Sequence, residues 1–221
     1  MDNKKVFLND KYGHEIIDDT RIGLGNTIKG KVQIYDKIDN ELVKIDDEPN
    51  LVLYIGREWL AQRAANETCS GFHNDLKNGY LNWFGIGTNG ASPGDILTPL
   101  RPTIDQETLL SPIVLNASES SYLNLTQGGN DYQLKEIGNK SFVKDIVNDN
   151  RYLIFQAQTT IISTDANGPS GSTYYDINEA GLYIGDETGT PDTISIFARC
   201  TFSTIRKDIS REIVFVWNIY F

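Results

Sequence analysis

Residues 213–221 read Ile-Val-Phe-Val-Trp-Asn-Ile-Tyr-Phe, and this stretch decides the fold class. Apolar residues occupy both alternating faces of the segment, which predicts a strand that must be covered on both sides. Sheet packing or a neighbouring subunit can supply that cover. We assign its alternate large side chains to a core strand: Ile213, Phe215, Trp217, Ile219 and Phe221.

Further strands are expected upstream, where the hydrophobic period is two. They are Tyr80–Ile86, Tyr152–Ser163, Tyr174–Ile184 and Ile194–Phe202. Apolar residues at spacings of three to four predict one short helix near residues 50–65, with Asn50 as its candidate cap. Several strands separated by Gly- and Pro-containing turns predict a mainly β protein, an antiparallel, jelly-roll-like β-sandwich.

The chain is expected to have two parts. Residues 1–49 are predicted to form an N-terminal arm or β-ribbon, because the segment is polar at first and then alternates from residue 32. Residues 50–221 hold the helix and the predicted strands, and we expect them to form the sandwich domain.

A long loop is expected at residues 87–112, which contain four of the seven prolines. Structureless segments of this length inside a compact domain are usually functional or mobile. The loop is too apolar for a plain solvent loop, and proline reduces the entropy that it would lose on binding. We therefore interpret it as a candidate subunit-contact loop with these residues: Ile96, Leu97, Leu100, Arg101 and Ile104.

Charge and composition exclude several classes. The 221 residues include 20 Lys plus Arg and 30 Asp plus Glu, which gives a net charge of −10. We expect no direct nucleic-acid binding from so acidic a chain, and no membrane span, because no run of about 18 apolar residues occurs. The first residues lack an apolar run and the two cysteines, Cys69 and Cys200, make no disulfide framework, so folding in a reducing cytoplasm is expected.

Formal motifs for phosphate or metal binding are incomplete. Residues 25–31 fit G-x-x-x-x-G-K, but Val32 follows where Ser or Thr is needed, so a basic turn is predicted. His14 and His73 have no standard metal-ligand spacing with the cysteines. The loop that begins at Asp165 resembles a calcium loop only in part, and we interpret it as a solvated turn. No metal site and no cofactor are predicted.

Catalytic chemistry finds equally little support. Asp131, Glu136 and Glu179 are carboxylates that a glycoside hydrolase would need in pairs, but nothing in the sequence selects a pair. No nucleophile elbow or triad pattern occurs. The aromatic residues lie on strand patterns, which favours core packing over a sugar groove. The prediction is that the protein is not an enzyme, with a hydrolase as a minor alternative.

Five segments, in order, resemble those of many tailed-bacteriophage virion proteins. The first is a helix with Gly-Arg-x-x-Leu-Ala character at residues 56–61. The second is Tyr80–Ala91, with an aromatic-x-Gly-Ile-Gly-Thr pattern, and it is followed, as in that family, by a loop with Asp, Leu and Pro at Asp95–Pro102. The others are Asn178–Tyr183, Phe197–Phe202 and the final strand. The resemblance covers about residues 50–221, and Asn89 departs from it where glycine is usual.

The resemblance implies a non-enzymatic β-sandwich subunit of a phage neck, tail or baseplate. Its partners would be copies of itself, in a ring or other oligomer, and other virion proteins. Its location would be the virion, after synthesis and folding in the host cytoplasm. Two alternatives stay open: a capsid decoration or head-fibre protein, and a carbohydrate- or receptor-binding sandwich that uses the polar loops around residues 124–132 and 165–175.

Overall fold

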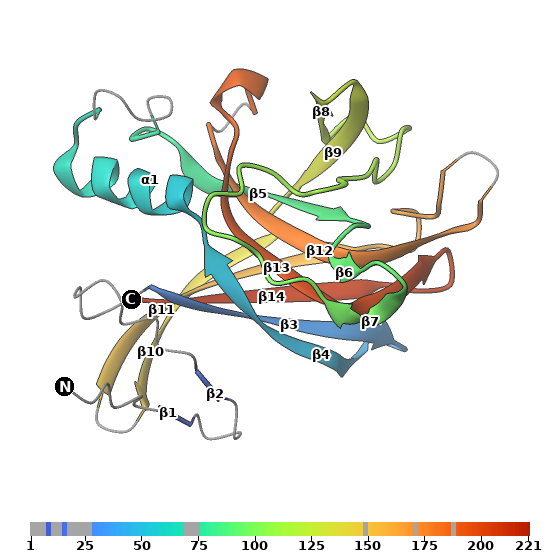
Figure 1. Cartoon of the computed structure of the whole chain (residues 1–221), viewed down its shortest axis with the longest axis horizontal. Coiled ribbons are helices and arrows are strands. Elements are labelled where there is room, and N and C mark those ends of the chain that lie inside the picture. The colour runs from blue at the N-terminus through green and yellow to red at the C-terminus, as the bar shows by residue number, and fades with distance from the viewer. Residues whose placement is uncertain are drawn as a thin grey trace.

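The computed structural model describes residues 8–9, 15–16, 28–68, 76–147, 150–169, 172–186 and 189–221. These residues are mainly β, with one α-helix (Figure 1). Before the helix α1 (Tyr54–Ala65) the strands are β1 (Leu8–Asn9), β2 (Glu15–Ile16), β3 (Lys29–Ile38) and β4 (Glu41–Val52). After it come β5 (Tyr80–Gly87), β6 (Ala91–Ser92), β7 (Asp95–Pro99), β8 (Leu123–Gln127), β9 (Asn130–Glu136), β10 (Asn139–Val147), β11 (Asn150–Ile161), β12 (Tyr174–Gly185), the 3₁₀ turn η1 (Pro191–Thr193), β13 (Ser195–Asp208) and β14 (Ile213–Tyr220).

Ten of the strands form one large antiparallel sheet. Their order is β10-β11-β14-β3-β4-β13-β12-β5-β9-β8. The four strands predicted upstream of residue 213 are all present, as β5, β11, β12 and β13; β13 extends six residues beyond its predicted end, and the other ends shift by at most two. The mainly β class and the antiparallel pairing are thus confirmed.

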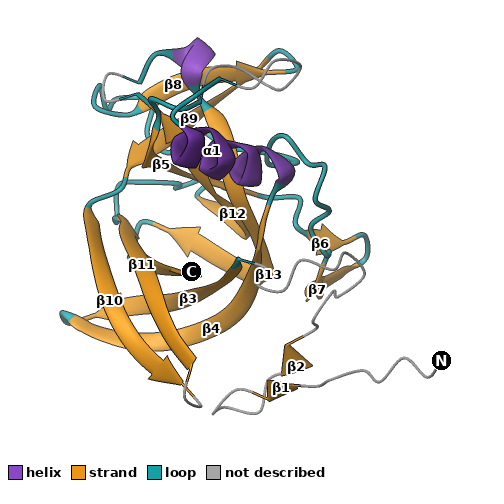
Figure 2. Cartoon of the chain, turned by 90° about the vertical axis from the view of Figure 1, so that its left-hand side faces the viewer, coloured by secondary structure: helices purple, strands orange, loops and turns teal. Residues whose placement is uncertain are grey.

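The sheet curls back on itself, so that its two halves face each other across the core. The rings of Phe84 on β5 and Phe215 on β14 lie 5.0 Å apart, although the two strands are five steps apart in the strand order. Strands are spaced about 4.8 Å apart, so a flat sheet would separate these rings by more than 20 Å. Figure 2 shows the curvature, with β10, β11, β3 and β4 forming one wall.

A second apolar cluster covers the other face of β5, β12 and β13. Trp83, Tyr183 and Ile196 alternate with core residues along these strands and pack with Tyr132 and Leu134 of β9. The central strands of this half are therefore buried on both faces, which explains their near-continuous apolar sequences.

The final strand β14 is also buried on both faces within the chain. Ile213, Phe215, Trp217 and Ile219 are fully buried, and Val214 and Val216 on the opposite face are at most 9% exposed. Sheet packing supplies this cover, so no neighbouring subunit is needed. The prediction that Phe221 is a core residue is wrong, because 46% of its surface is exposed.

Helix α1 begins later than predicted. Asn50 is not its cap, since this residue lies in β4 opposite Gly30, and the helix follows Leu53 without a side-chain cap. Gly56 allows a close approach to β13, because a Cβ atom there would lie 2.3 Å from the carbonyl oxygen of Phe197. The edge-to-face contact of Trp59 with Phe197 fixes the helix against the sheet.

The boundary predicted between residues 49 and 50 falls inside β4. β3 pairs with β14 over residues 29–36, and β4 continues the same sheet toward β13. The alternating segment that begins at residue 32 is therefore built into the ten-stranded sheet. The predicted arm before it lies largely outside the described residues.

Residues 114–147, a polar stretch in the sequence, contain three strands. Residues 124–132, expected as a polar loop, belong to the β8–β9 hairpin, which turns at Gly128 and Gly129 with φ of +56° and +82°. β10 pairs with β11 and is the strand at one end of the large sheet.

Candidate subunit-contact site

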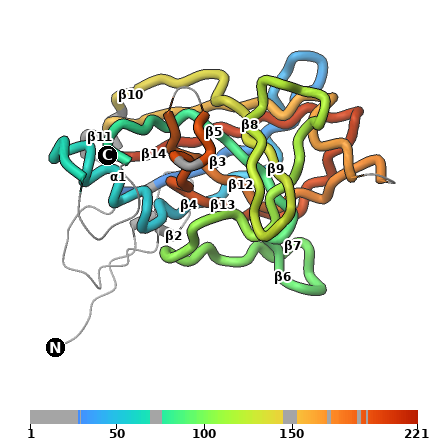
Figure 3. The backbone as a smooth tube through the Cα atoms, turned by 90° about the horizontal axis from the view of Figure 1, so that it is seen from above, coloured from blue at the N-terminus to red at the C-terminus, as the bar shows by residue number. Residues whose placement is uncertain are grey.

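The predicted loop at residues 87–112 contains a small hairpin, β6–β7, and continues as turns to residue 115. The hairpin lies at the margin of the molecule, away from α1 (Figures 1 and 3). It turns at Gly94, whose φ of +83° favours glycine. The loop is thus partly ordered as β structure, which the proline content did not indicate.

Two aliphatic side chains project from this hairpin. Ile96 is 60% exposed and Leu97 is 67% exposed. The Asp95 carboxylate accepts the Leu97 N–H at 3.1 Å and the Thr98 hydroxyl at 2.6 Å. These hydrogen bonds lower the pKa of Asp95 and hold the turn that presents both side chains to solvent.

The other three predicted loop residues have different roles. Arg101 is exposed, whereas Leu100 and Ile104 are partly buried. The Leu100 carbonyl accepts the Thr201 hydroxyl at 2.5 Å, and the Ile104 carbonyl accepts the Tyr54 N–H at 2.9 Å. Leu100 and Ile104 therefore tie the loop to β13 and α1, and the exposed contact residues are Ile96, Leu97 and Arg101.

A buried ion pair anchors the loop from below. The Arg199 Nη2 atom on β13 lies 2.6 Å from the Glu179 Oε2 atom on β12, and both side chains are at most 1% exposed. Glu179 also accepts the backbone N–H groups of Leu110 at 3.0 Å and Ser111 at 2.8 Å. Arg199 donates to the Gln106 side-chain oxygen at 2.5 Å. One ion pair thus fixes two separate points of the loop.

Glycines make room for this anchor. A Cβ atom on Gly87 would lie 2.5 Å from both the Glu179 Oε1 atom and the Ser111 carbonyl oxygen. A Cβ atom on Gly90 would lie 2.2 Å from the Asn178 carbonyl oxygen, and the Gly90 N–H donates to the Asn178 side chain at 2.5 Å. Three of the sequence segments that resemble phage proteins therefore meet here, on the neighbouring strands β5, β12 and β13.

The three carboxylates considered for hydrolysis lie in different surroundings, and Glu136 is exposed at the end of β9. Glu179 is fully buried and ion-paired, while Asp131 is exposed on the β8–β9 hairpin and accepts the Thr126 hydroxyl. The aromatic residues considered for a sugar groove are mostly core. Trp83, Phe84, Tyr183 and Trp217 are buried. Tyr174 is half-exposed, and the Arg206 guanidinium lies 4.0 Å from the centre of its ring.

The prediction of a solvated turn at Asp165 is wrong, because the Asp165 side chain is fully buried. The Asp165 carboxylate accepts the Tyr122 hydroxyl and the Lys135 ammonium, each at 2.8 Å. The buried Lys207 ammonium donates to the Asp165 carbonyl, the Asn167 side chain and the Asp208 carbonyl at 2.6–3.1 Å. Burial lowers the pKa of Lys207 to about 8. A lysine therefore occupies the place that a cation would take in a calcium loop.

Several sequence motifs lie outside the described residues: His14, Cys69, His73 and the start of the glycine segment at residues 25–27. Gly30 and Lys31, which end that segment, belong to β3. In the described part of the chain, no three His, Cys, Asp or Glu side chains form a group that could hold a metal ion.

No family model, no curated protein and no solved structure matches this chain. Among the helices of the described ranges, none has the length and apolar character to cross a membrane.

Proposed function

We propose that this protein is a structural subunit of a tailed-phage virion, of the neck, tail or baseplate type, and that its activity is assembly. Under this proposal it works as a homo-oligomer together with other virion proteins, and it catalyses no reaction. The five ordered sequence segments support the class, and the packing of three of them around one buried anchor gives them a common structural purpose.

One observation carries the proposal: two neighbouring aliphatic side chains, Ile96 and Leu97, are exposed on a loop that is held in place from inside. A buried ion pair between charged groups costs desolvation energy, so it is a weak device for stability alone. Here it fixes the loop before any partner arrives, and a fixed loop loses less entropy when it binds. Exposed apolar side chains on such a loop are typical of a protein contact.

The finer fold that we propose is a β-sandwich. Its two layers would be β10-β11-β14-β3 and β13-β12-β5-β9, with β4 passing from one to the other. The contact between Phe84 and Phe215 across the core supports this arrangement. The sandwich is the scaffold on which the loop is presented.

The proposal is tested by removing the exposed apolar groups. Ile96→Ser combined with Leu97→Ser should leave the melting temperature nearly unchanged, since neither side chain is buried, and should weaken association or incorporation into particles. Ile209→Ser, which changes a side chain that is 71% exposed in the β13–β14 turn, is the matched control. Normal assembly of the loop variant would contradict the role of this loop.

A further inference from the structure

We propose that the free edge of β10 in one copy pairs with the free edge of β4 in the next copy, so that the sheet continues from subunit to subunit. This inference rests on the proposed function, because it names the partner surface as a second copy of this chain. It uses the backbone edges of β4 and β10, whereas the loop contact uses the side chains of Ile96 and Leu97, so separate substitutions test the two contacts.

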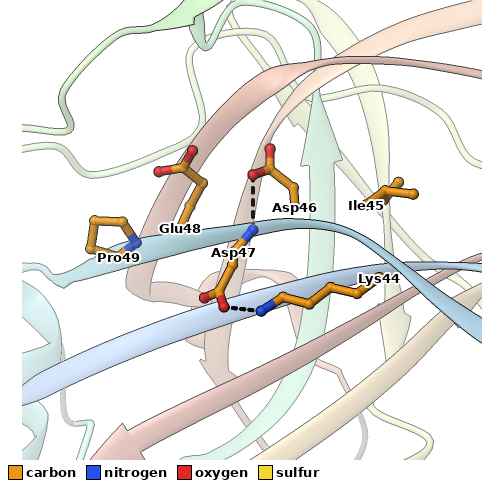
Figure 4. Close-up of a pocket in the computed structure, with 6 residues that line it drawn as sticks. All are labelled: Lys44, Ile45, Asp46, Asp47, Glu48 and Pro49. Atoms are coloured by element: carbon orange, nitrogen blue, oxygen red, sulfur yellow. Dashed lines mark hydrogen bonds and ion pairs between the residues drawn. The ribbon is translucent and has the colours of Figure 1, made fainter. Parts of the chain in front are cut away.

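The first free edge belongs to β4. This strand pairs with β3 along residues 41–50, but among the described residues it pairs with β13 only at Leu51 and Val52. No described residue is a ladder partner for the backbone groups on the second side of β4 over residues 41–50. A shallow depression of about 530 Å³ follows this part of β4 and is lined by residues 44–49 (Figure 4). An unpaired edge of this kind is a template for another strand.

The β4 edge carries uncompensated negative charge. Asp46 and Glu48 lie opposite the core residues Ile34 and Val32, so both carboxylates are on the core-facing side of the sheet. Asp47 points to the other side and pairs with Lys31 at 2.9 Å and with Lys44. Asp46 and Glu48 have no ion pair among the described residues, and burial together with the charges of Asp46 and Asp47 raises the pKa of Glu48 to about 7. A cation beside these two carboxylates would stabilise their charged forms against burial and mutual repulsion.

The second free edge belongs to β10, at the end of the sheet. Phe142 lies opposite Phe155 on the core-facing side, but 69% of its surface is exposed. Lys140 and Lys144 are on the same side of the strand, two residues before and after it. Lys140 donates to the Asn82 side chain at 2.6 Å, and both lysines are exposed. This edge therefore presents an apolar side chain between two positive charges.

The directions of the two strands permit a head-to-tail contact. The order β10-β11-β14-β3-β4 contains four antiparallel steps, so β10 and β4 run in the same direction within one copy. Rotation about an axis along the strands then brings the β10 of the next copy parallel to β4, with the core-facing sides matched. Repetition of such a rotation closes a ring.

The opposite charges of the two edges favour a second copy of this chain as the partner strand. In a parallel pairing with Phe142 beside Glu48, Lys140 lies beside Asp46. Lys144 then lies diagonal to Glu48, a distance that long side chains span. Lysines on an edge strand discourage pairing with most strands, but they favour an acidic edge. This chain of net charge −10 offers such an edge on its own surface.

The test is a charge swap with rescue, read as molecular mass by light scattering and as incorporation into particles. Lys140→Glu with Lys144→Glu, and separately Asp46→Lys with Glu48→Lys, should each weaken association at least about tenfold, because like charges then face each other. An equimolar mixture of the two variants should associate again, since each copy then meets an opposite charge. Glu67→Lys with Asp105→Lys, a reversal of two exposed charges elsewhere, is the control.

Foldedness is checked by circular dichroism and thermal melting. If a reversal variant fails to fold, the milder pair Asp46→Asn and Glu48→Gln replaces it, and association should weaken and lose its dependence on salt. Association of both reversal variants at the wild-type level would overturn the pairing, as would two folded, impaired variants that do not rescue each other. If either result is found while the wild-type protein still associates, the strand pairing is wrong but the proposed assembly function is retained.

Discussion

The Arg199 guanidinium and the Glu179 carboxylate form an ion pair, with 2.6 Å between Nη2 and Oε2, that is completely enclosed by the protein. It lies beneath a loop whose tip is among the most exposed apolar surface of the described residues. The buried Arg199–Glu179 pair thus holds the exposed loop in place through hydrogen bonds to Gln106, Leu110 and Ser111.

Removal of one partner of the ion pair should be strongly destabilising. Arg199→Met leaves a buried carboxylate without its cation, and the free energy of unfolding in urea should fall by about 3–5 kcal/mol. Glu179→Met should cost a similar amount, because it also removes the acceptor for two backbone N–H groups of the loop. The double variant should lose less than the sum of the two single losses, since neither charge is then left alone. Strict additivity would show that the two groups do not act as a pair.

Gly87→Ala should destabilise the protein by about 1–3 kcal/mol, because the added methyl group overlaps the Glu179 carboxylate and the Ser111 carbonyl oxygen. Gly138→Ala is the matched control, since the nearest atom to its added Cβ is 3.8 Å away. Both are measured by thermal melting. Equal melting temperatures for the two variants would contradict the close approach of loop and strand at Gly87.

Trp217→Asp should abolish folding, because it places a charge in a strand that is buried on both faces. Phe221→Asp tests the correction to the predicted core strand. Its side chain is 46% exposed, so this variant should fold and melt cooperatively. Soluble, cooperatively folded Trp217→Asp protein would contradict the assignment of β14 to the core.

The contribution of Glu48 to the free energy of unfolding should fall as the pH rises from about 4.5 to 7. Its pKa is raised from 4.5 to about 7 in the folded protein, so the folded state binds more protons than the unfolded state in this interval. Glu48→Gln should reduce the slope of stability against pH, measured by urea unfolding at several pH values. An unchanged slope in Glu48→Gln would contradict the burial of this group.

The long strands could be predicted from the sequence because alternation and two-sided apolar runs are local signals. The start of the helix could not, since Asn50 resembles a cap but is held in β4 by pairing with Gly30. β8 and β10 were hidden by polar side chains, which are common on strands that lack a neighbour on one side.

The site was predictable only in part. Prolines and spare aliphatic residues marked the loop, and Ile96 and Leu97 are indeed exposed. The partnership of Glu179 with Arg199 depends on the register of β12 against β13, which places Glu179 opposite Thr201 and Gly181 opposite Arg199. A single sequence contains no local signal for that register. The free edge of β10 follows from the strand order, and that of β4 from its short pairing with β13; the residue pattern reveals neither.

The most direct test of assembly as the activity is the mass of the purified protein in solution, measured by light scattering over a range of concentrations, together with mass spectrometry of intact phage particles. A subunit that acts by assembly should form a multimer of defined size, and copies of this chain should be found in the particles. A protein that stays monomeric at high concentration and is missing from the particles would contradict it.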